Sequence, residues 1–261
     1  MKETVNILWT GGLESTYRVA ELSRRDVVIQ PHYVATDRTS VKYELRAIDR
    51  ITKVLQADSR TMATILPPIV ADTPEDGPEY ADILQAYELL HHATSFKSTQ
   101  YRALAKYARR HHLRLEIGLQ FSPVGSIVKV LDTSSLIEAP GYKDVLMVDP
   151  RSEEQQWASY TLFKDFLFPK SLIHKTKREE LDELKAMGYQ KIIRHLWTCY
   201  TPIFGLPCGH CFPCRSAKKE GSTEMMSTVG NLLWAMKIKI REMLPEAIYT
   251  RLSRTVHAIV G

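Results

Sequence analysis

The chain has 261 residues, of which 44% are hydrophobic and 25% charged, with 35 Lys and Arg against 30 Asp and Glu. This composition is that of an ordinary globular protein with a full core, so it excludes a disordered chain, a collagen-like repeat and a disulfide-stapled miniprotein. The net charge of +5 is too small to indicate a nucleic-acid binder that works by bulk charge.

The first part of the chain alternates strand and helix patterns. The apolar run 5–9 precedes a glycine turn at 10–12, after which apolar residues recur at helical spacing through Leu22. The pattern repeats with an apolar stretch at 27–34 and a helical period over 44–55. Strand, helix, strand, helix predicts parallel βαβ units that wind right-handedly, with helices covering the sheet.

The chain continues this pattern up to about residue 190. Its predicted segments are a strand within 59–69, a loop over 72–78, helices over 80–90 and 100–110, and strands over 113–119 and 146–149. A polar-faced helix follows at 175–187 and is predicted to end at Gly188, because glycine favours the conformation that closes a helix. We therefore expect an α/β domain over residues 1–190, followed by a cysteine segment and a helical tail over 191–261.

Two features bear on the compartment. No stretch approaches the roughly 18 consecutive apolar residues of a membrane span, and residues 1–12 lack the pattern of a secretory signal. All four cysteines lie between Cys199 and Cys214, whereas a disulfide framework would spread them along the chain. We therefore expect a cytoplasmic protein with reduced thiols and no membrane association.

The tail over 225–244 has the pattern of a basic amphipathic helix. Its apolar residues fall near one face, and Lys237, Lys239 and Arg241 lie between them. Such a helix can lie on a membrane, but packing on its own domain or on a partner is the commoner use. A homodimer therefore stays open as a prediction.

The turn Thr10-Gly11-Gly12-Leu13-Glu14-Ser15-Thr16 lies between a predicted strand and a predicted helix. Backbone N–H groups and the helix dipole favour a bound phosphate at such a position, and the Ser and Thr hydroxyls can donate to its oxygens. The turn is neither a Walker A loop nor a GxGxxG fingerprint. Taken alone, it leaves a plain tight turn and a phosphate-binding loop both open.

The cysteine segment has the spacing of a metal site. Eight residues separate Cys199 from Cys208, and two residues lie between Cys208 and Cys211 and again between Cys211 and Cys214. Four thiolates close a tetrahedral zinc site with no open position for water, so we expect a structural role for the metal. A redox CxxC pair and four unrelated thiols are the alternatives.

Together the two motifs resemble one known family. The turn resembles the Ser-Gly-Gly-x-Asp-Ser signature of the PP-loop ATP pyrophosphatases, with Thr10 for Ser and Glu14 for Asp. The stretches 196–200 and 208–215 are similar to the zinc segment of 7-cyano-7-deazaguanine synthases, which have CGxCxxC and Arg at this spacing. Asp37 with Glu44, and the stretch 168–188, extend the resemblance over about residues 5 to 220.

The resemblance implies a Rossmann-like parallel sheet of the PP-loop type with a zinc site beside the active cleft. Enzymes of this family adenylate the carboxylate of 7-carboxy-7-deazaguanine with Mg-ATP and release pyrophosphate. Ammonia then gives an amide, and a second ATP-dependent round dehydrates the amide to a nitrile. We therefore expect an ATP-dependent carbon–nitrogen ligase that takes a small-molecule carboxylate and uses ATP, Mg²⁺ and Zn²⁺.

The resemblance also assigns roles to particular residues. The implied catalytic residues are Glu14, Asp37 and Lys97, of which Asp37 would face the metal or ribose and Lys97 the transferred phosphate. The zinc ligands would be the four cysteines. The implied nucleotide contacts are Thr10, Gly11, Gly12, Leu13, Glu14, Ser15, Thr16, Val34 and Thr36.

The middle of the chain departs from the family. Where those enzymes have Val-Pro-Gly-Arg-Asn, this chain has residues 95–100 (SFKSTQ), and the motif that lines the deazapurine pocket is replaced by 121–126 (FSPVGS). The sequence therefore indicates a diverged paralogue of the queuosine-pathway enzyme with a changed second substrate. A modified nucleobase, another small carboxylate, or a carboxylate on a sugar or a protein terminus would fit, and a nucleic-acid acceptor stays open.

Two other functions compete with the ligase. One is a PP-loop sulfur transferase that acts on RNA and carries persulfide on two of the cysteines. The other is a non-catalytic protein that binds nucleotide or RNA through the zinc segment and its basic flank, Arg215, Lys218 and Lys219.

Overall fold

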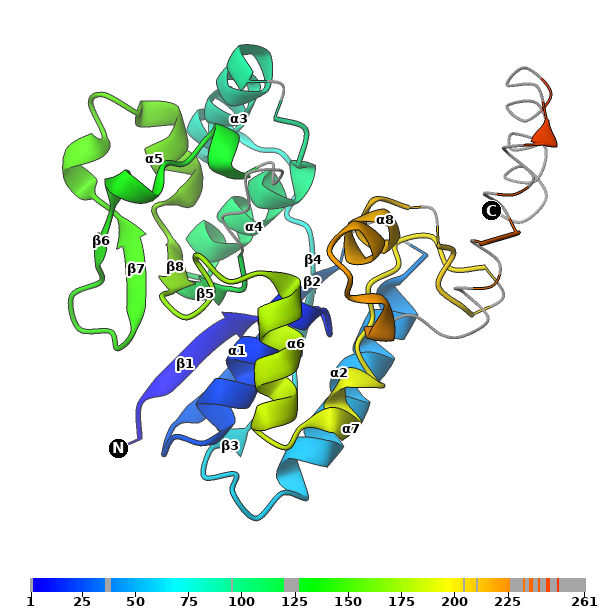
Figure 1. The fold of residues 1–261 in the computed structure, drawn as a ribbon. Helices are drawn as coiled ribbons and strands as arrows, with labels where there is room; N and C mark the ends of the chain where they lie inside the picture. Colours follow the sequence, from blue (N-terminus) through cyan, green and yellow to red (C-terminus); the bar gives the residue numbers. More distant parts are fainter. Residues whose placement is uncertain are drawn as a thin grey trace.

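The computed structural model describes residues 2–35, 39–94, 96–119, 127–203, 205–209 and 211–225, and in the tail 232, 235–236, 239, 243–244 and 248. These residues form a mixed α/β fold around one central sheet (Figure 1). The sheet is mostly parallel, which confirms the coarse fold class predicted from the alternating patterns. No helix in the described part of the chain is long and apolar enough to cross a membrane.

Eight strands make up this sheet in the described residues. They are β1 (Thr4–Leu8), β2 (Val28–Ala35), β3 (Thr64–Ile65), β4 (Ile69–Asp72), β5 (Leu115–Ile117), β6 (Leu136–Glu138), β7 (Val145–Val148) and β8 (Phe166–Pro169). Their order is β3-β2-β1-β5-β8-β7-β6, and β4 also pairs with β2. Strands β1 to β5 and β8 pair in parallel, whereas β6, β7 and β8 pair antiparallel. The chain therefore builds outward from β1 toward β2 first, and later from the other side of β1 through β5.

Helices cover both faces of the sheet and enclose two cores. They are α1 (Leu13–Ser23), α2 (Val41–Gln56), α3 (Ala81–Thr94), α4 (Thr99–Arg110), α5 (Trp157–Phe163), α6 (Lys177–Ala186), α7 (Gln190–Ile193) and α8 (Phe212–Lys219). In β1, Val5 and Ile7 pack into the core of α1, α2, α6 and α7, whereas Leu8 packs against the core of α3, α4 and α5. This alternation follows from the two-residue period of a strand.

The third predicted strand is divided in two. β3 ends at Ile65 and β4 begins at Ile69, and both pair with β2. Pro67 and Pro68 lie between them and have no backbone N–H to donate to a neighbouring strand. Pro31 of β2 lies at the same level, between the residues that pair with β3 and those that pair with β4. The prolines therefore explain why the structure has two short strands where the sequence predicted one strand within 59–69.

The antiparallel end of the sheet also differs from the predicted parallel arrangement. Only one strand was expected over 120–170, at 146–149, whereas the structure has β6, β7, α5 and β8 there. β6 is a three-residue edge strand whose side chains are half-buried or exposed, so it has little apolar pattern. β8 is buried at all four positions, and such a short run cannot be distinguished from a helix segment by its period.

The end of α6 at Gly188 is confirmed. Gly188 has a φ of +83°, in the left-handed region, and its N–H donates to the carbonyl of Lys185 at 2.8 Å. The N–H of Tyr189 donates to the carbonyl of Leu184, also at 2.8 Å. These two bonds close the helix as a Schellman motif. At the other end, Thr176 and Glu179 form a capping box, so the start of α6 is fixed as well.

A buried histidine connects the sheet to α4. The side chain of His32 lies 2.8 Å from the hydroxyl of Tyr107 and 2.9 Å from Oδ1 of Asn6. Burial, with a smaller effect of His111, lowers the pKa of His32 from 6.5 to about 4. His32 is therefore neutral in the folded protein at neutral pH.

We expect this histidine to make the protein less stable in mild acid. Between about pH 6.5 and pH 4 the unfolded chain binds a proton at His32 that the folded chain does not, so the free energy of unfolding falls as the pH is lowered through this interval. Urea unfolding at a series of pH values measures this loss. His32→Gln retains polar groups for Asn6 and Tyr107 but does not titrate, so an equally steep loss in that variant would contradict the assignment.

Candidate functional site

A cavity of about 710 Å³ opens where the parallel strands end. Its floor includes the last residue of β1, Leu8, the last residue of β5, Ile117, and Val34 near the end of β2. The chain builds toward β2 on one side of β1 and toward β5 on the other, so this edge is the topological switch point of the sheet. Open α/β sheets bind their ligands at such a point, which makes the cavity the candidate site.

The glycine turn forms one wall of the cavity. α1 begins after Gly12, and no side chain caps its first turn. Thr10, Gly12 and Ser15 line the cavity, so the amino end of α1 opens into it. The free N–H groups and the dipole at a helix start attract an anion, and here no capping oxygen satisfies them.

The two glycines of the turn have different roles. Gly11 has a φ of +71°, and a Cβ there would lie 2.9 Å from Cβ of Ala47 in α2. Gly12 has ordinary dihedral angles, and its nearest neighbours to an added Cβ are Oγ1 of Thr10 at 3.4 Å and the carbonyl of Trp197 at 3.7 Å. Gly11 is therefore required for packing, whereas Gly12 tolerates a methyl group sterically.

The structure brings most of the predicted site residues to this cavity. Those that line it are Thr10, Gly12, Leu13, Glu14, Ser15, Val34 and Lys97. Gly11 packs against α2, and Thr16 is fully buried, where its hydroxyl accepts a hydrogen bond from the indole of Trp9 at 3.0 Å. Thr36, Asp37 and the departing stretch 121–126 lie outside the described residues, as do Ser95 and most of the predicted tail helix.

A lysine from α6 connects Glu14 to α8. Nζ of Lys177 lies 3.3 Å from Oε1 of Glu14 and 3.3 Å from Oε1 of Glu220, and all three side chains line the cavity. Burial opposes the charge of Lys177, but the two carboxylates outweigh burial and raise its pKa. Lys177 is therefore a fixed cation close to the amino end of α1.

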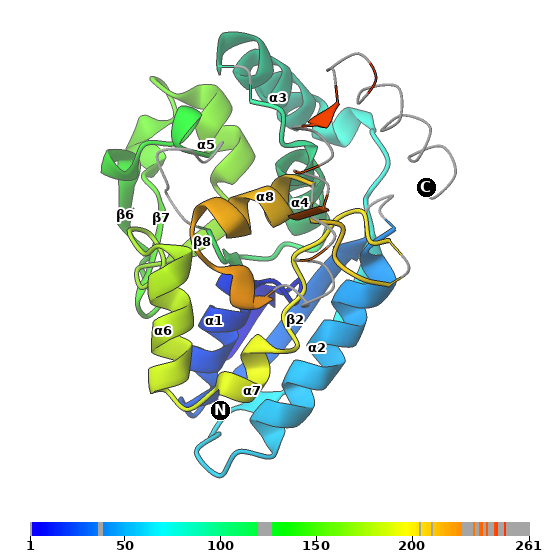
Figure 2. The same ribbon diagram turned by 45° about the vertical axis from the view of Figure 1, so that its right-hand side comes forward.

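The segment before the cysteines forms the adjacent wall of the cavity. The backbone N–H of Trp197 donates to the carbonyl of Gly11 at 2.9 Å. Its ring stacks on Tyr43 with centroids 4.7 Å apart, and its indole N–H donates to the carbonyl of Cys199 at 2.7 Å. Figure 2 shows α8, which follows this segment, above α1. The cysteine segment is thus held directly against the glycine turn.

Sequence reasoning missed Lys177 and Gly118 as site residues. Lys177 is the first residue of α6, and the capping box at Thr176 predicts that helix start but not the direction in which it points. A Cβ on Gly118 would lie 2.6 Å from the backbone nitrogen of Ser15, so only glycine allows β5 to end against α1. A glycine at the end of a predicted strand was the available signal.

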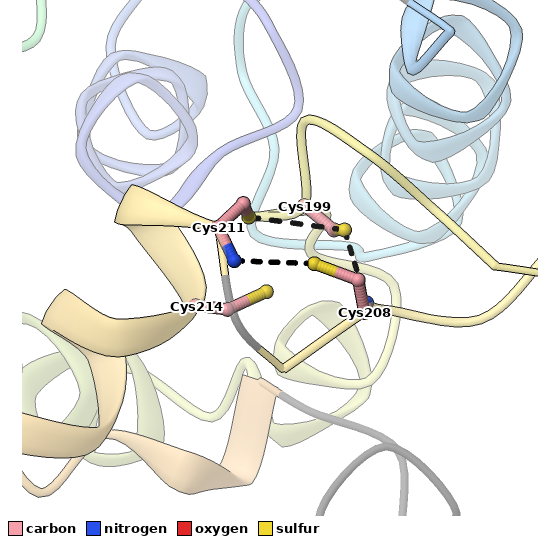
Figure 3. Close-up of side chains that lie close together, drawn as sticks. All are labelled: Cys199, Cys208, Cys211 and Cys214. Carbon is pink, nitrogen blue, oxygen red and sulfur yellow. Dashed lines mark hydrogen bonds between the residues drawn. The ribbon is translucent and has the colours of Figure 1, made fainter. Parts of the chain in front are cut away.

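The four cysteines form a compact group beside this wall (Figure 3). Their sulfur atoms all lie within 4.8 Å of one another, and no disulfide joins them. Three of the cysteines are buried and Cys211 is partly exposed. The N–H of Cys208 donates to the sulfur of Cys199 at 3.1 Å, and the N–H of Cys211 to that of Cys208 at 3.2 Å.

This geometry fits a tetrahedral metal ion. A zinc ion with Zn–S distances of about 2.3 Å places its sulfurs about 3.8 Å apart, close to the 4.0 Å between Cys211 and Cys199. Backbone N–H groups that point at sulfur stabilise thiolates in such centres. The hydrogen bond with Cys199 is the main reason that the pKa of Cys211 is lowered, which favours its thiolate form. The group can therefore hold zinc.

We expect the purified protein to contain about one zinc ion per chain, because four sulfurs at this spacing complete a tetrahedral shell. Cys214→Ser should lose most of the zinc and lower the melting temperature, since Cys214 is buried in the first turn of α8. Elemental analysis and thermal unfolding measure the two effects. Full zinc content in Cys214→Ser, or a disulfide in the wild type under reducing conditions, would contradict the assignment.

Comparisons with known proteins leave the site without an assigned activity. A scan against models of protein families gives no match for this chain. A search of proteins with curated functions gives no match either. What the cavity and the cysteine group do is therefore inferred from their residues and geometry.

Proposed function

We propose that this protein is an ATP-dependent ligase of the PP-loop type, similar to the 7-cyano-7-deazaguanine synthases, which adenylates a carboxylate for attack by ammonia or an amine. The observation that carries this proposal is the uncapped start of α1, which opens into a cavity that is also lined by neighbours of the four cysteines, such as Trp197 and Phe212. A phosphate-binding turn and a zinc segment that resemble the same family thus meet at one site.

The residues of the cavity suit the transfer of AMP to a carboxylate. The N–H groups at the start of α1 would hold the phosphates of ATP, and Lys177 and Lys97 are the lysines that line the cavity. Lys97 lines the cavity, where its charge would contact a bound phosphate. Because a carboxylate is already nucleophilic at neutral pH, this reaction needs alignment and charge neutralisation but no general base.

Magnesium and zinc would have separate roles. Glu14 lies at the start of α1 in the cavity and would be the described carboxylate nearest to a magnesium ion that accompanies the phosphates. The four cysteines would hold zinc and so fix the segment that carries Trp197 and α8. Magnesium would neutralise phosphate charge, whereas zinc in a closed shell of four sulfurs would act through structure alone.

The acceptor would occupy the remaining part of the cavity. Ser98 and Gln100 at the start of α4 line that cavity together with Tyr200 and Phe212. Phe212 is 65% exposed although its ring is large and apolar, so it offers an aromatic face to a planar ligand. These residues favour a small aromatic carboxylate, 7-carboxy-7-deazaguanine or a relative of it.

The geometry gives no support to the sulfur-transferase alternative. A persulfide carrier must reach the substrate, yet none of the four cysteines lines the cavity. Three of them are buried, and all four sulfurs converge on one point. This arrangement favours a metal centre over an exchanging pair of thiols.

The two glycines should respond differently to alanine. We expect Gly12→Ala to fold normally but to weaken ATP binding about tenfold or more, because a methyl group there would lie beside Thr10 and Glu14, which line the cavity at the start of α1. Gly11→Ala should instead lower the free energy of unfolding by about 1–3 kcal/mol, since its backbone is left-handed and crowded. Calorimetric titration with Mg-ATP and urea unfolding measure the two effects. Unchanged ATP affinity in Gly12→Ala would contradict a phosphate-binding role.

The ligase reaction itself can be tested with labelled ATP. We expect zinc-loaded protein with Mg-ATP and 7-carboxy-7-deazaguanine, or another small aromatic carboxylate, to release pyrophosphate and form an acyl adenylate. Lys177→Met should reduce the rate at least tenfold, because it removes the cation beside the amino end of α1. If ATP binds but no carboxylate releases pyrophosphate, the protein is a nucleotide-binding protein and the ligase proposal fails.

A further inference from the structure

Glu220 occupies a position that the stability of its own helix does not explain. It directly follows the last residue of α8, and a negative charge at a helix carboxyl end is opposed by the helix dipole. Its carboxylate nevertheless points inward, where it accepts a hydrogen bond from the hydroxyl of Ser216 and pairs with Lys177. Both Ser216 and Glu220 line the cavity.

Lys177 already has three polar partners in this arrangement. An ammonium group has three N–H donors and no acceptor. Nζ of Lys177 lies 3.3 Å from Glu14, 3.3 Å from Glu220 and 3.4 Å from the hydroxyl of Ser216. An anion that binds Lys177 therefore competes with these partners, of which Ser216 lies in α8 and Glu220 directly follows it.

The charges of the group also oppose a bound anion. Glu14, Lys177 and Glu220 together carry a net charge of −1, and only 16% of the Lys177 side chain is exposed to solvent. Because these side chains are partly buried, water screens the excess negative charge less than it would on the surface, so the charge repels an anion more strongly. The helix start of α1 attracts the phosphates of a ligand, while Glu220 competes with those phosphates for Lys177.

We propose that Glu220 is a positioning residue that competes with bound pyrophosphate for Lys177 and so accelerates release of this product. The inference rests on the proposed function, in which pyrophosphate forms at the start of α1. While pyrophosphate is bound, Lys177 pairs with its oxygens. When pyrophosphate leaves, Lys177 pairs again with Glu220 and Ser216. Only hydrogen bonds and ion pairs are exchanged in this step, and no covalent bond is formed or broken. Product release limits the turnover of many enzymes, so such a competitor raises kcat.

Binding of Mg-pyrophosphate to the zinc-loaded full chain tests this role without depending on catalysis. Glu220→Gln keeps the size of the side chain and can still accept a hydrogen bond, but it removes the charge that competes for Lys177. We expect it to bind pyrophosphate about tenfold more tightly than the wild type in a calorimetric titration. In turnover it should lower kcat, because pyrophosphate would leave more slowly.

A double-mutant cycle shows whether the effect acts through Lys177. Lys177→Met should weaken pyrophosphate binding, and Glu220→Gln should then have little further effect because the cation for which it competes is absent. Glu224→Gln is the matched control. Glu224 pairs with Arg178 at 3.2 Å and Lys185 at 2.8 Å but does not line the cavity, so its loss removes the same charge nearby without changing pyrophosphate affinity.

The outcomes separate this inference from the proposed function. If the wild type binds pyrophosphate and Glu220→Gln binds it equally or less tightly, with zinc content and melting temperature unchanged, the release role is overturned. Equal tightening in Glu224→Gln would overturn it too, since the effect would then be one of overall charge. If the wild type binds neither Mg-ATP nor Mg-pyrophosphate, the proposed function itself fails.

Discussion

One backbone hydrogen bond joins the two motifs of this protein. The N–H of Trp197 donates to the carbonyl of Gly11 at 2.9 Å, and Trp197 lies two residues before Cys199. The position of the cysteine group relative to the glycine turn is therefore set by a contact in the turn itself. Gly11 makes this contact in a left-handed conformation, packed against α2, where an added Cβ would lie 2.9 Å from Cβ of Ala47. A change at either partner would separate the walls of the cavity.

The cavity contains a balance of charge built from three helices. The start of α1 is positive because of its unsatisfied N–H groups, and Lys177 at the start of α6 adds a full charge beside it. Glu14 and Glu220 offset this charge. The arrangement suits a polyanion that arrives with a divalent cation and must leave again, rather than one that is held permanently. A pyrophosphate-releasing reaction has these requirements.

Much of the fold follows from the sequence because its local patterns agree with its tertiary contacts. Alternate residues of β1 pack into two different cores, one on each face of the sheet. The end of α6 at Gly188 depends on the left-handed backbone conformation of that glycine. The divided edge strand was missed because the effect of Pro67 and Pro68 depends on Pro31 in the neighbouring strand. β7 was predicted at 146–149, but β6 and β8 were missed because such short strands carry little period.

The candidate site was predictable only where its residues are contiguous. The turn from Thr10 to Ser15 and the cysteine group each lie within one short segment, and the spacing within each segment indicated its chemistry. Lys177 and Glu220 come from helices distant in the chain, and their meeting at Glu14 is a property of the fold. No local pattern could reveal a cation shared by three helices.

A crystal structure of the zinc-loaded protein with magnesium and a non-hydrolysable ATP analogue tests the central claim most directly. We expect the triphosphate to lie over the backbone N–H groups of residues 12–15, between the start of α1 and the residues of α8 that line the cavity, with Lys177 in contact with its oxygens. A nucleotide bound elsewhere, or a cavity that stays without nucleotide at saturating concentration, would contradict it.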